Sequence, residues 1–285
     1  TMTKRWQSHD ATLAAVGGTE SPASSFQSSS RGFSKLNSDC PWDDFDPSWY
    51  FERNYKKLRG DDRRIVELVR DFFAKLDFPS HRHGVDVGSG SNLYPALTML
   101  PFCDEITFYE YAASNVAWLR RETQSYSRSW DPWWRLLIKE PVYKSLDSPR
   151  EALAAAVRVE RGSIFDLPES RWDIGTMFFV AESISSALSE FHTALASFIR
   201  SLRPGAPFAA AFMKNSLGYD VGTHRFPAVA IAEEDVESDL AGKTDNLKIY
   251  RLGKTSNPLR DGYDGMILAV GKVRENLYQN GKDDR

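Results

Sequence analysis

The 285-residue sequence has few of the residues that build metal clusters and disulfide frameworks. It contains two cysteines, Cys40 and Cys103, and five scattered histidines. Two cysteines are too few for the framework of a small disulfide-rich protein, and neither lies at the spacing of a zinc ligand. We therefore expect neither a disulfide scaffold nor a metal site.

Long apolar runs and a surplus of positive charge are also missing. No run approaches the roughly 18 apolar residues that a membrane-spanning helix needs, and the first residues hold no apolar segment typical of a signal peptide. The net charge is −3, which gives no electrostatic basis for binding nucleic acid or an anionic membrane. These absences favour a cytoplasmic protein. As partners we expect a small-molecule acceptor and neither nucleic acid nor membrane, with the chain as a monomer or weak homodimer.

Residues 1–40 are rich in Ser, Thr, Gly and Gln and poor in aliphatic residues. Such a segment buries too little apolar surface to offset its ordering entropy, so we expect a disordered tail. It is either a plain leader or a lid that orders over a ligand. The remaining residues, 41–285, suffice for a single domain, which begins with a helical cap predicted over 41–80.

Hydrophobic periodicity predicts alternating strands and helices in the rest of the chain. Strands are predicted over residues 83–88, 105–111, 155–162, 172–183, 206–213, 247–253 and 265–273. The nearly continuous apolar run over 206–213 is typical of a buried central strand in a parallel sheet. The alternation predicts an α/β, Rossmann-like, doubly wound sheet of about seven strands, mostly parallel with an antiparallel C-terminal strand.

The expected helices begin at Asp46-Pro47 and at Glu233 and cover residues 61–76, 93–100, 114–125 and 186–202. The segment over 126–156 is too long for an ordinary connection and is expected to be an inserted helical segment. Its tryptophans at positions 130, 133 and 134 either wall an aromatic pocket or pack the insert on the core, and burial statistics favour packing.

A glycine turn follows the first predicted strand, in the stretch HGVDVGSGSNLY over 83–94. Gly88 and Gly90 let the backbone take left-handed angles and approach a ligand closely, at the strand end where open parallel sheets bind ligands. The third glycine of the dinucleotide fingerprint G-x-G-x-x-G is replaced by Leu93. The stretch therefore predicts a nucleoside-like ligand and argues against a dinucleotide.

Glu110 ends the second predicted strand, 22 residues after Gly88. An acidic residue at that place can accept hydrogen bonds from ribose hydroxyls, and Tyr111 beside it can stack on an adenine. Taken alone, Glu110 could equally be a solvated carboxylate at a strand end. In register with the glycine turn, it favours a nucleoside-binding site.

The chain resembles the class I S-adenosylmethionine-dependent methyltransferases, and among them the nicotinamide/phenylethanolamine/thioether (indolethylamine) N-methyltransferase family. The segments that carry the resemblance are FDPSWYFERNY, VDVGSGSNLY, YEYAASNVAWL, WDIGTMFFVAESI, SLRPGAPFAAAF and VGTHRFPAVAIAEEDV. Ser91 stands where this family usually has proline. The glycine–tyrosine loop and the N-terminal aromatic element together make the resemblance fairly specific.

The resemblance implies S-adenosyl-L-methionine as cofactor, with S-adenosyl-L-homocysteine as product. The contacts that it implies come from Tyr50, Tyr55, Gly88, Ser89, Gly90, Tyr94, Glu110, Tyr111 and Asn115. Where the family usually has an acidic residue for the adenine amino group, this sequence has Ser163, which with the Ile164 amide can serve instead. Phe178 and Val180 are expected to line the site.

Glu182 is the strongest candidate for acceptor chemistry, because it matches a position where the amine-methylating relatives carry an acidic residue. It can pair with a cationic amine or accept its proton; otherwise it is a carboxylate before a helix N-terminus. Asn215 and Tyr219 can hydrogen-bond a polar acceptor. Lys214 would repel a cation, so the sequence leaves the acceptor unidentified.

We therefore predict a methyltransferase that acts on a small molecule, preferentially on the nitrogen of an amine or N-heterocycle. Two alternatives stay open at this point. The first is transfer to carbon or oxygen of an aromatic, indole-like metabolite. The second is a protein that binds the cofactor without turnover.

Overall fold

The computed structural model describes residues 35–77, 82–253 and 262–276. Most of the predicted disordered tail, residues 1–34, lies outside the described residues. The described end of the expected tail is hydrogen-bonded to the domain: the Lys35 N–H donates to Ser186 Oγ at 2.8 Å, and the Lys35 carbonyl accepts the Ser186 N–H at 2.9 Å.

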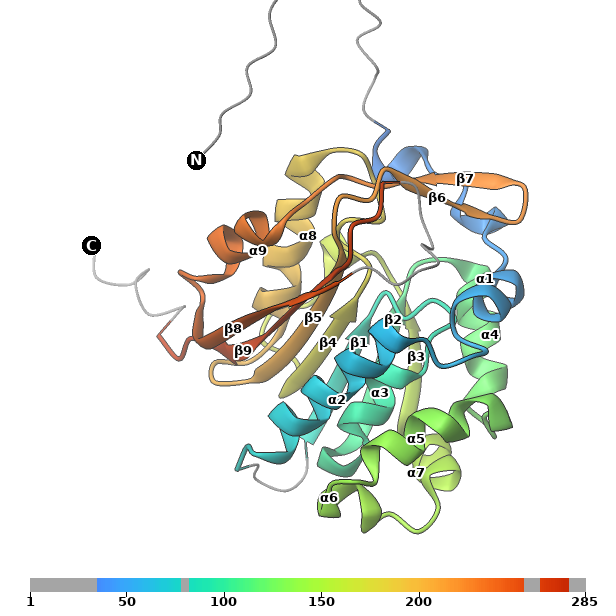
Figure 1. Ribbon diagram of the computed structural model, residues 1–285, viewed down its shortest axis with the longest axis vertical. Coiled ribbons are helices and arrows are strands. Elements are labelled where there is room, and N and C mark those ends of the chain that lie inside the picture. The colour runs from blue at the N-terminus through green and yellow to red at the C-terminus, as the bar shows by residue number, and fades with distance from the viewer. Residues whose placement is uncertain (1–34, 78–81, 254–261, 277–285) are drawn as a thin grey trace, which may run out of the picture. The chain divides into compact units, whose positions relative to one another are not determined.

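Seven strands form a mixed sheet in the order β3-β2-β1-β4-β5-β9-β8 (Figure 1). Strands β1 to β5 run parallel, and β9 is antiparallel to both β5 and β8. The strands are β1 Arg82–Val87, β2 Cys103–Glu110, β3 Val157–Arg161, β4 Ile174–Phe178, β5 Pro207–Met213, β8 Thr244–Leu252 and β9 Met266–Val273. The predicted Rossmann-like, doubly wound fold is confirmed.

Helices cover both faces of this sheet. In Figure 1, α8 and α9 lie on one side and α2 and α3 on the other. Because side chains alternate along a strand, β5 places Phe208 and Phe212 in the core beneath α8, and Ala209 and Met213 in the opposite core. The main helices are α1 Pro47–Asn54, α2 Gly60–Ala74, α3 Tyr94–Met99, α4 Ala113–Glu122, α8 Leu188–Ser201 and α9 Glu233–Leu240.

Local signals explain where the N-terminal helices form. The Asp46 side chain caps α1 by accepting the Trp49 N–H at 3.0 Å, and Pro47 occupies the first helical position. In α2, Ile65, Val69 and Phe73 recur every four residues, and all three are fully buried. This periodicity turns one face of α2 toward the core.

The tryptophan-rich segment over 126–156 adds three short helices. They are α5 Asp131–Leu137, α6 Pro141–Lys144 and α7 Pro149–Ala156. Trp130 and Trp133 are fully buried and Trp134 is nearly so, all within the core cluster that includes α2 and α3. The tryptophans therefore pack the insert onto the core.

Two elements differ from the sequence prediction. The strand expected over 172–183 stops at Phe178, because Phe179 has a φ of 60°, a left-handed backbone angle that ends a strand. An antiparallel hairpin, β6 Gly218–Val221 and β7 His224–Pro227, was not predicted. Its four-residue strands are too short for alternation of apolar residues to be distinctive.

Asp86 in β1 carries a buried carboxyl beneath the glycine turn. It is 1% exposed, and its Oδ1 accepts the Thr176 hydroxyl of the neighbouring strand at 2.8 Å. Its Oδ2 has no hydrogen-bond partner among the described residues. Burial is the main cause that raises the pKa of this carboxyl to about 7.

Replacing Asp86 with asparagine is expected to stabilise the protein more at pH 8 than at pH 5, relative to wild type. The unfolded carboxyl ionises near pH ~3.9 and the folded one near 7. Wild type therefore loses stability as pH rises between those values, because the folded state retains a proton that the unfolded state has lost.

Urea unfolding of both proteins at the two pH values measures this effect. The gap between their free energies of unfolding should widen on the order of 2 kcal/mol from pH 5 to pH 8. A gap that does not depend on pH would contradict the assignment.

Candidate cofactor and acceptor site

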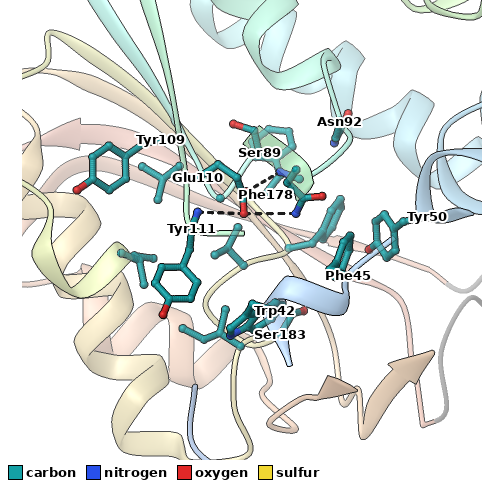
Figure 2. A pocket seen from close by; sticks show the side chains of 18 of the residues that line it. Trp42, Phe45, Tyr50, Ser89, Asn92, Tyr109, Glu110, Tyr111, Phe178 and Ser183 are labelled. Atoms are coloured by element: carbon teal, nitrogen blue, oxygen red, sulfur yellow. Dashed lines mark hydrogen bonds between the residues drawn. The ribbon is translucent and has the colours of Figure 1, made fainter. Parts of the chain in front are cut away.

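A cavity lies at the carboxyl ends of β1, β2 and β4 (Figure 2). Its volume is about 780 Å³, part of which is open to solvent. One side is formed by the glycine turn after β1 and the ends of β2 and β3. The other side is aromatic and comes from the N-terminal segment, the end of β4 and the β6–β7 hairpin. The cavity thus lies where ligands bind in open α/β sheets.

The glycine turn needs its glycines for two different reasons. Gly88 has a φ of +66°, and a Cβ there would come within 2.5 Å of a Val180 methyl group. Gly90 has a φ of +56°, and a Cβ there would meet only open space. Gly88 is therefore required by packing and backbone angle, whereas Gly90 leaves its backbone accessible from the cavity.

Glu110 at the end of β2 organises the floor of the cavity. Its Oε2 accepts the Gly90 N–H at 2.8 Å, and its Oε1 accepts the Tyr111 N–H at 3.0 Å (Figure 2). The same Oε1 also accepts the Ala112 N–H at 3.0 Å. Burial raises the pKa of this carboxyl, and the backbone hydrogen bonds oppose that rise. The carboxylate is thus fixed in place with little freedom to reorient.

Asn115, in the first turn of α4, adds a further polar group to the floor. Its Nδ2 donates to Glu110 Oε1 at 3.3 Å. Its Oδ1 is buried and has no partner within the part of the chain that the structure describes. A fixed carboxylate, an amide oxygen with spare accepting capacity and an open glycine backbone suit a ligand that carries several hydroxyl groups.

The segment after β3 forms the wall beside Tyr111. Gly162 packs against the ring of Tyr109, where any Cβ would overlap the Tyr109 hydroxyl. Ser163 caps the following turn by accepting the Phe165 N–H at 3.2 Å. Tyr111 is 46% exposed at the rim. Tyr111 and the Ser163–Ile164 turn therefore line the same cavity.

An aromatic roof covers the other side of the cavity; we use this name for Trp42, Phe45, Tyr50, Tyr219 and Phe226. The Trp42 ring stacks on Phe226 at 5.0 Å between centroids, and Tyr219 stacks on Phe226 at 5.6 Å. Phe45 packs on Tyr50 at 5.3 Å. The roof joins the N-terminal segment to the β6–β7 hairpin.

Most of the residues that the sequence nominates come together around this cavity. Those that line it are Tyr50, Tyr55, Gly88, Ser89, Gly90, Glu110, Tyr111, Asn115, Ser163, Ile164, Phe178, Val180 and Tyr219. Glu110 is the one acidic residue of the described lining, which holds no Lys, Arg or His. Apart from Glu110, the described lining is therefore apolar and aromatic, with hydroxyl and amide groups.

Three nominated residues lie outside the lining. Tyr94 is fully buried behind it, where its hydroxyl donates to Asp62. Asn215 follows β5 in a left-handed conformation, with φ of 56°, and its N–H donates to the Ile231 carbonyl at 3.0 Å. Glu182 is also fully buried. A direct contact between these side chains and a ligand would require a rearrangement.

Glu182 holds the loop after β4 against β5. Its Oε1 accepts the Met213 N–H at 3.0 Å and the Ser183 hydroxyl at 3.2 Å. Its carbonyl accepts the Val229 N–H at 2.9 Å. Ser183 itself lines the cavity and its carbonyl accepts the Tyr219 hydroxyl at 2.8 Å. The carboxylate thus lies one hydrogen bond behind the cavity wall.

Several lining residues were missed by sequence reasoning. They are Asn37, Trp42, Phe45, Asn92, Tyr109, Gly162, Phe179, Ser183 and Ile184, with Val87. Trp42 and Phe45 belong to a dense aromatic cluster in the sequence, which was the available signal. The others carry no local pattern that separates them from core or loop residues.

The described ranges contain neither a metal-binding cluster nor a membrane-spanning helix. No group of three or more His, Cys, Asp or Glu residues there is arranged to hold a metal ion. No helix in those ranges combines the length and apolar character needed to cross a membrane.

Several known proteins are similar to this chain. The phenylethanolamine N-methyltransferase of Macaca mulatta is 26% identical over 218 residues, which cover 69% of this chain and 76% of that protein. The Sus scrofa phenylethanolamine N-methyltransferase is 25% identical over 242 residues, covering 77% and 84%. Among solved structures, the N-methyltransferase NodS of Bradyrhizobium japonicum, in complex with S-adenosyl-L-homocysteine, has a TM-score of 0.49, 13% identity and coverage of 80% and 92%.

The family comparison covers most of the sequence. The model of the NNMT/PNMT/TEMT family matches residues 36–272, a range that contains the glycine turn, Glu110, the aromatic roof and the last strand except its final residue. The chain therefore belongs to the NNMT/PNMT/TEMT family and is an S-adenosylmethionine-dependent methyltransferase.

Proposed function

We propose that the cavity binds S-adenosylmethionine and that the methyl group passes to the nitrogen of a small-molecule amine or N-heterocycle. The observation that carries this proposal is the pairing of the Gly90 amide with the Glu110 carboxylate on one cavity wall. In that pair, a carboxylate held in a fixed position lies beside a glycine backbone that a ligand can approach. A ribose needs such a carboxylate to accept hydrogen bonds from its hydroxyls.

Each part of the cavity matches a part of the cofactor. Glu110 and Asn115 are suited to accept hydrogen bonds from the ribose hydroxyls. The part of the cavity that Tyr111 and Ile164 line suits a flat adenine ring. The Ser89 end of the turn, together with Tyr50 and Tyr55, suits the amino-acid end of the cofactor.

The protein's contribution to the transfer is to orient the reactants and exclude water. When bound, S-adenosylmethionine supplies a methyl group on a sulfonium whose departure leaves a neutral thioether. Alignment of an acceptor with that group can account for about 7–11 kcal/mol of the barrier. The roof residues Phe45, Tyr50 and Tyr219 present ring faces and edges that suit a flat acceptor and tolerate positive charge.

Glu182 is proposed to act through Ser183. A protonated amine must lose a proton before its nitrogen can attack. Ser183 lines the cavity, and its hydroxyl donates to Glu182 Oε1. A proton could pass from the acceptor to the Ser183 oxygen while the Ser183 proton moves to Glu182. This route needs no direct contact between the buried carboxylate and the acceptor.

Calorimetry with S-adenosylmethionine and, separately, with NAD tests the proposed cofactor. We expect saturable binding of S-adenosylmethionine and none of NAD, because the third glycine of the dinucleotide fingerprint is absent at Leu93. Uptake of a tritiated methyl group by a panel of amines and N-heterocycles then tests the reaction. Binding of NAD without S-adenosylmethionine would contradict the proposal.

Replacing Glu110 with glutamine is expected to weaken S-adenosylmethionine binding. Hydrogen bonds to a charged group contribute about 1.5–3 kcal/mol, so the Kd should rise roughly 10- to 100-fold. Glu160→Gln in β3 is the matched control, since Glu160 pairs with Arg171 and lies outside the cavity lining. Equal Kd values for the two variants would rule out the proposed role of Glu110.

Glu182→Gln and Ser183→Ala are expected to lower kcat for an amine acceptor while leaving the Kd of the cofactor unchanged. Glutamine still accepts the Met213 N–H, so the loop should keep its position. Loss of general base catalysis predicts a decrease of about 100-fold. Glu233→Gln is the control, as another buried glutamate that does not line the cavity. Unchanged kcat in both test variants would remove the relay.

A further inference from the structure

Asn37, on the aromatic side of the cavity, keeps a hydrogen-bond donor that the protein does not use. Asn37 lines the cavity, and its side-chain Nδ2 donates to no acceptor among the described residues. Two neighbouring hydroxyls in the lining are already committed, since Ser183 donates to Glu182 and Tyr219 donates to the Ser183 carbonyl. The Asn37 amide is therefore available to a ligand.

Trp42 determines which way the Asn37 amide points. The Trp42 Nε1–H lies 3.1 Å from the Asn37 backbone carbonyl and 3.1 Å from Asn37 Oδ1. An indole N–H can only donate, so the atom that faces it must be the amide oxygen. The amide NH₂ group consequently points away from the indole. The Trp42 ring is itself held by stacking on Phe226.

The backbone of Asn37 is anchored as well. Its N–H donates to Glu190 Oε2 in α8 at 2.9 Å, and its carbonyl accepts the Cys40 N–H at 3.3 Å. A side chain whose backbone and amide oxygen are already held loses little further freedom when its NH₂ group binds a ligand. Asn37 therefore presents a preorganised donor.

The contacts around Asn37 place it on the same side of the cavity as Ser183. The Cys40 thiol donates to the Ile184 carbonyl at 3.5 Å, and Ile184 directly follows Ser183 in the lining. Trp42 belongs to the aromatic roof. The Asn37 donor thus lies on the side of the cavity where the acceptor is proposed to bind.

The charge of the lining indicates what kind of group this donor can bind. The described lining holds no Lys, Arg or His. A carboxylate or phosphate on the ligand would lose its hydration there without a cation to compensate. The oxygen of a hydroxyl, ether or carbonyl group loses less, and a single N–H donor offsets most of that loss. The geometry therefore favours an uncharged oxygen.

We propose that Asn37 is a specificity-determining residue for the methyl acceptor. Its Nδ2 donates a hydrogen bond to an uncharged oxygen substituent of a flat amine or N-heterocycle whose reacting nitrogen faces Ser183. Trp42 is a positioning residue, because it holds Asn37 Oδ1 and so directs the NH₂ group. The inference rests on the proposed function, since it assumes that the acceptor occupies the aromatic side of the cavity.

Matched pairs of acceptors test this contact. The probes are benzylamine and pyridine, each compared with its hydroxy, methoxy and acetyl derivatives at every ring position. Uptake of a tritiated methyl group at saturating S-adenosylmethionine gives kcat/KM for each compound. Wild type should prefer at least one oxygenated compound over its parent by about three- to tenfold, as expected for one hydrogen bond between uncharged groups.

Asn37→Asp isolates the donor, because a carboxylate still accepts the Trp42 Nε1–H but donates nothing. It should abolish the preference, and its added charge acts on both members of a pair and so cancels in their ratio. Trp42→Phe keeps a ring on Phe226 but releases the amide, so it should reduce the preference. Asn246→Asp makes the same change at an exposed position in β8, outside the lining, and should keep the wild-type preference. Both aspartate variants should bind S-adenosylmethionine as wild type does.

Two results would overturn the inference alone. One is a wild-type protein that methylates the parent compounds but prefers none of the oxygenated ones. The other is an Asn37→Asp variant that keeps the wild-type preference, whether or not its Kd for the cofactor changes. A wild-type protein that binds no S-adenosylmethionine, or that methylates no member of the panel, would instead overturn the proposed function, and this inference with it.

Discussion

The hydrogen bond between the Gly90 amide and the Glu110 carboxylate ties the ends of two neighbouring strands together. It requires β1 and β2 to run parallel and end at the same edge of the sheet, and it requires a turn that places its N–H groups toward β2. Gly88 makes that turn possible through its left-handed backbone. The rest of the site is arranged around this pair, with Asn115 beside it and the aromatic roof across the cavity.

The aromatic roof completes the cavity. The roof joins the N-terminal segment to the β6–β7 hairpin through the stacked rings of Trp42 and Phe226.

The glycine turn was predictable because its backbone angles require glycine. Glu110 was predictable because it ends a strand, and a parallel sheet brings the ends of neighbouring strands together. The positions of Tyr94 and Glu182 were not. The family motifs that contain Tyr94 and Glu182 place both residues near the site. The direction in which each side chain points, however, depends on partners such as Asp62 and Met213, which are distant in the chain. The β6–β7 hairpin was missed because its strands are too short to show a period.

A crystal structure with S-adenosyl-L-homocysteine tests the central claim most directly. The account predicts the ribose hydroxyls on Glu110 and the adenine between Tyr111 and Ile164. A nucleoside bound elsewhere, or bound in the cavity with Glu110 still directed only at its own backbone amides, would contradict it.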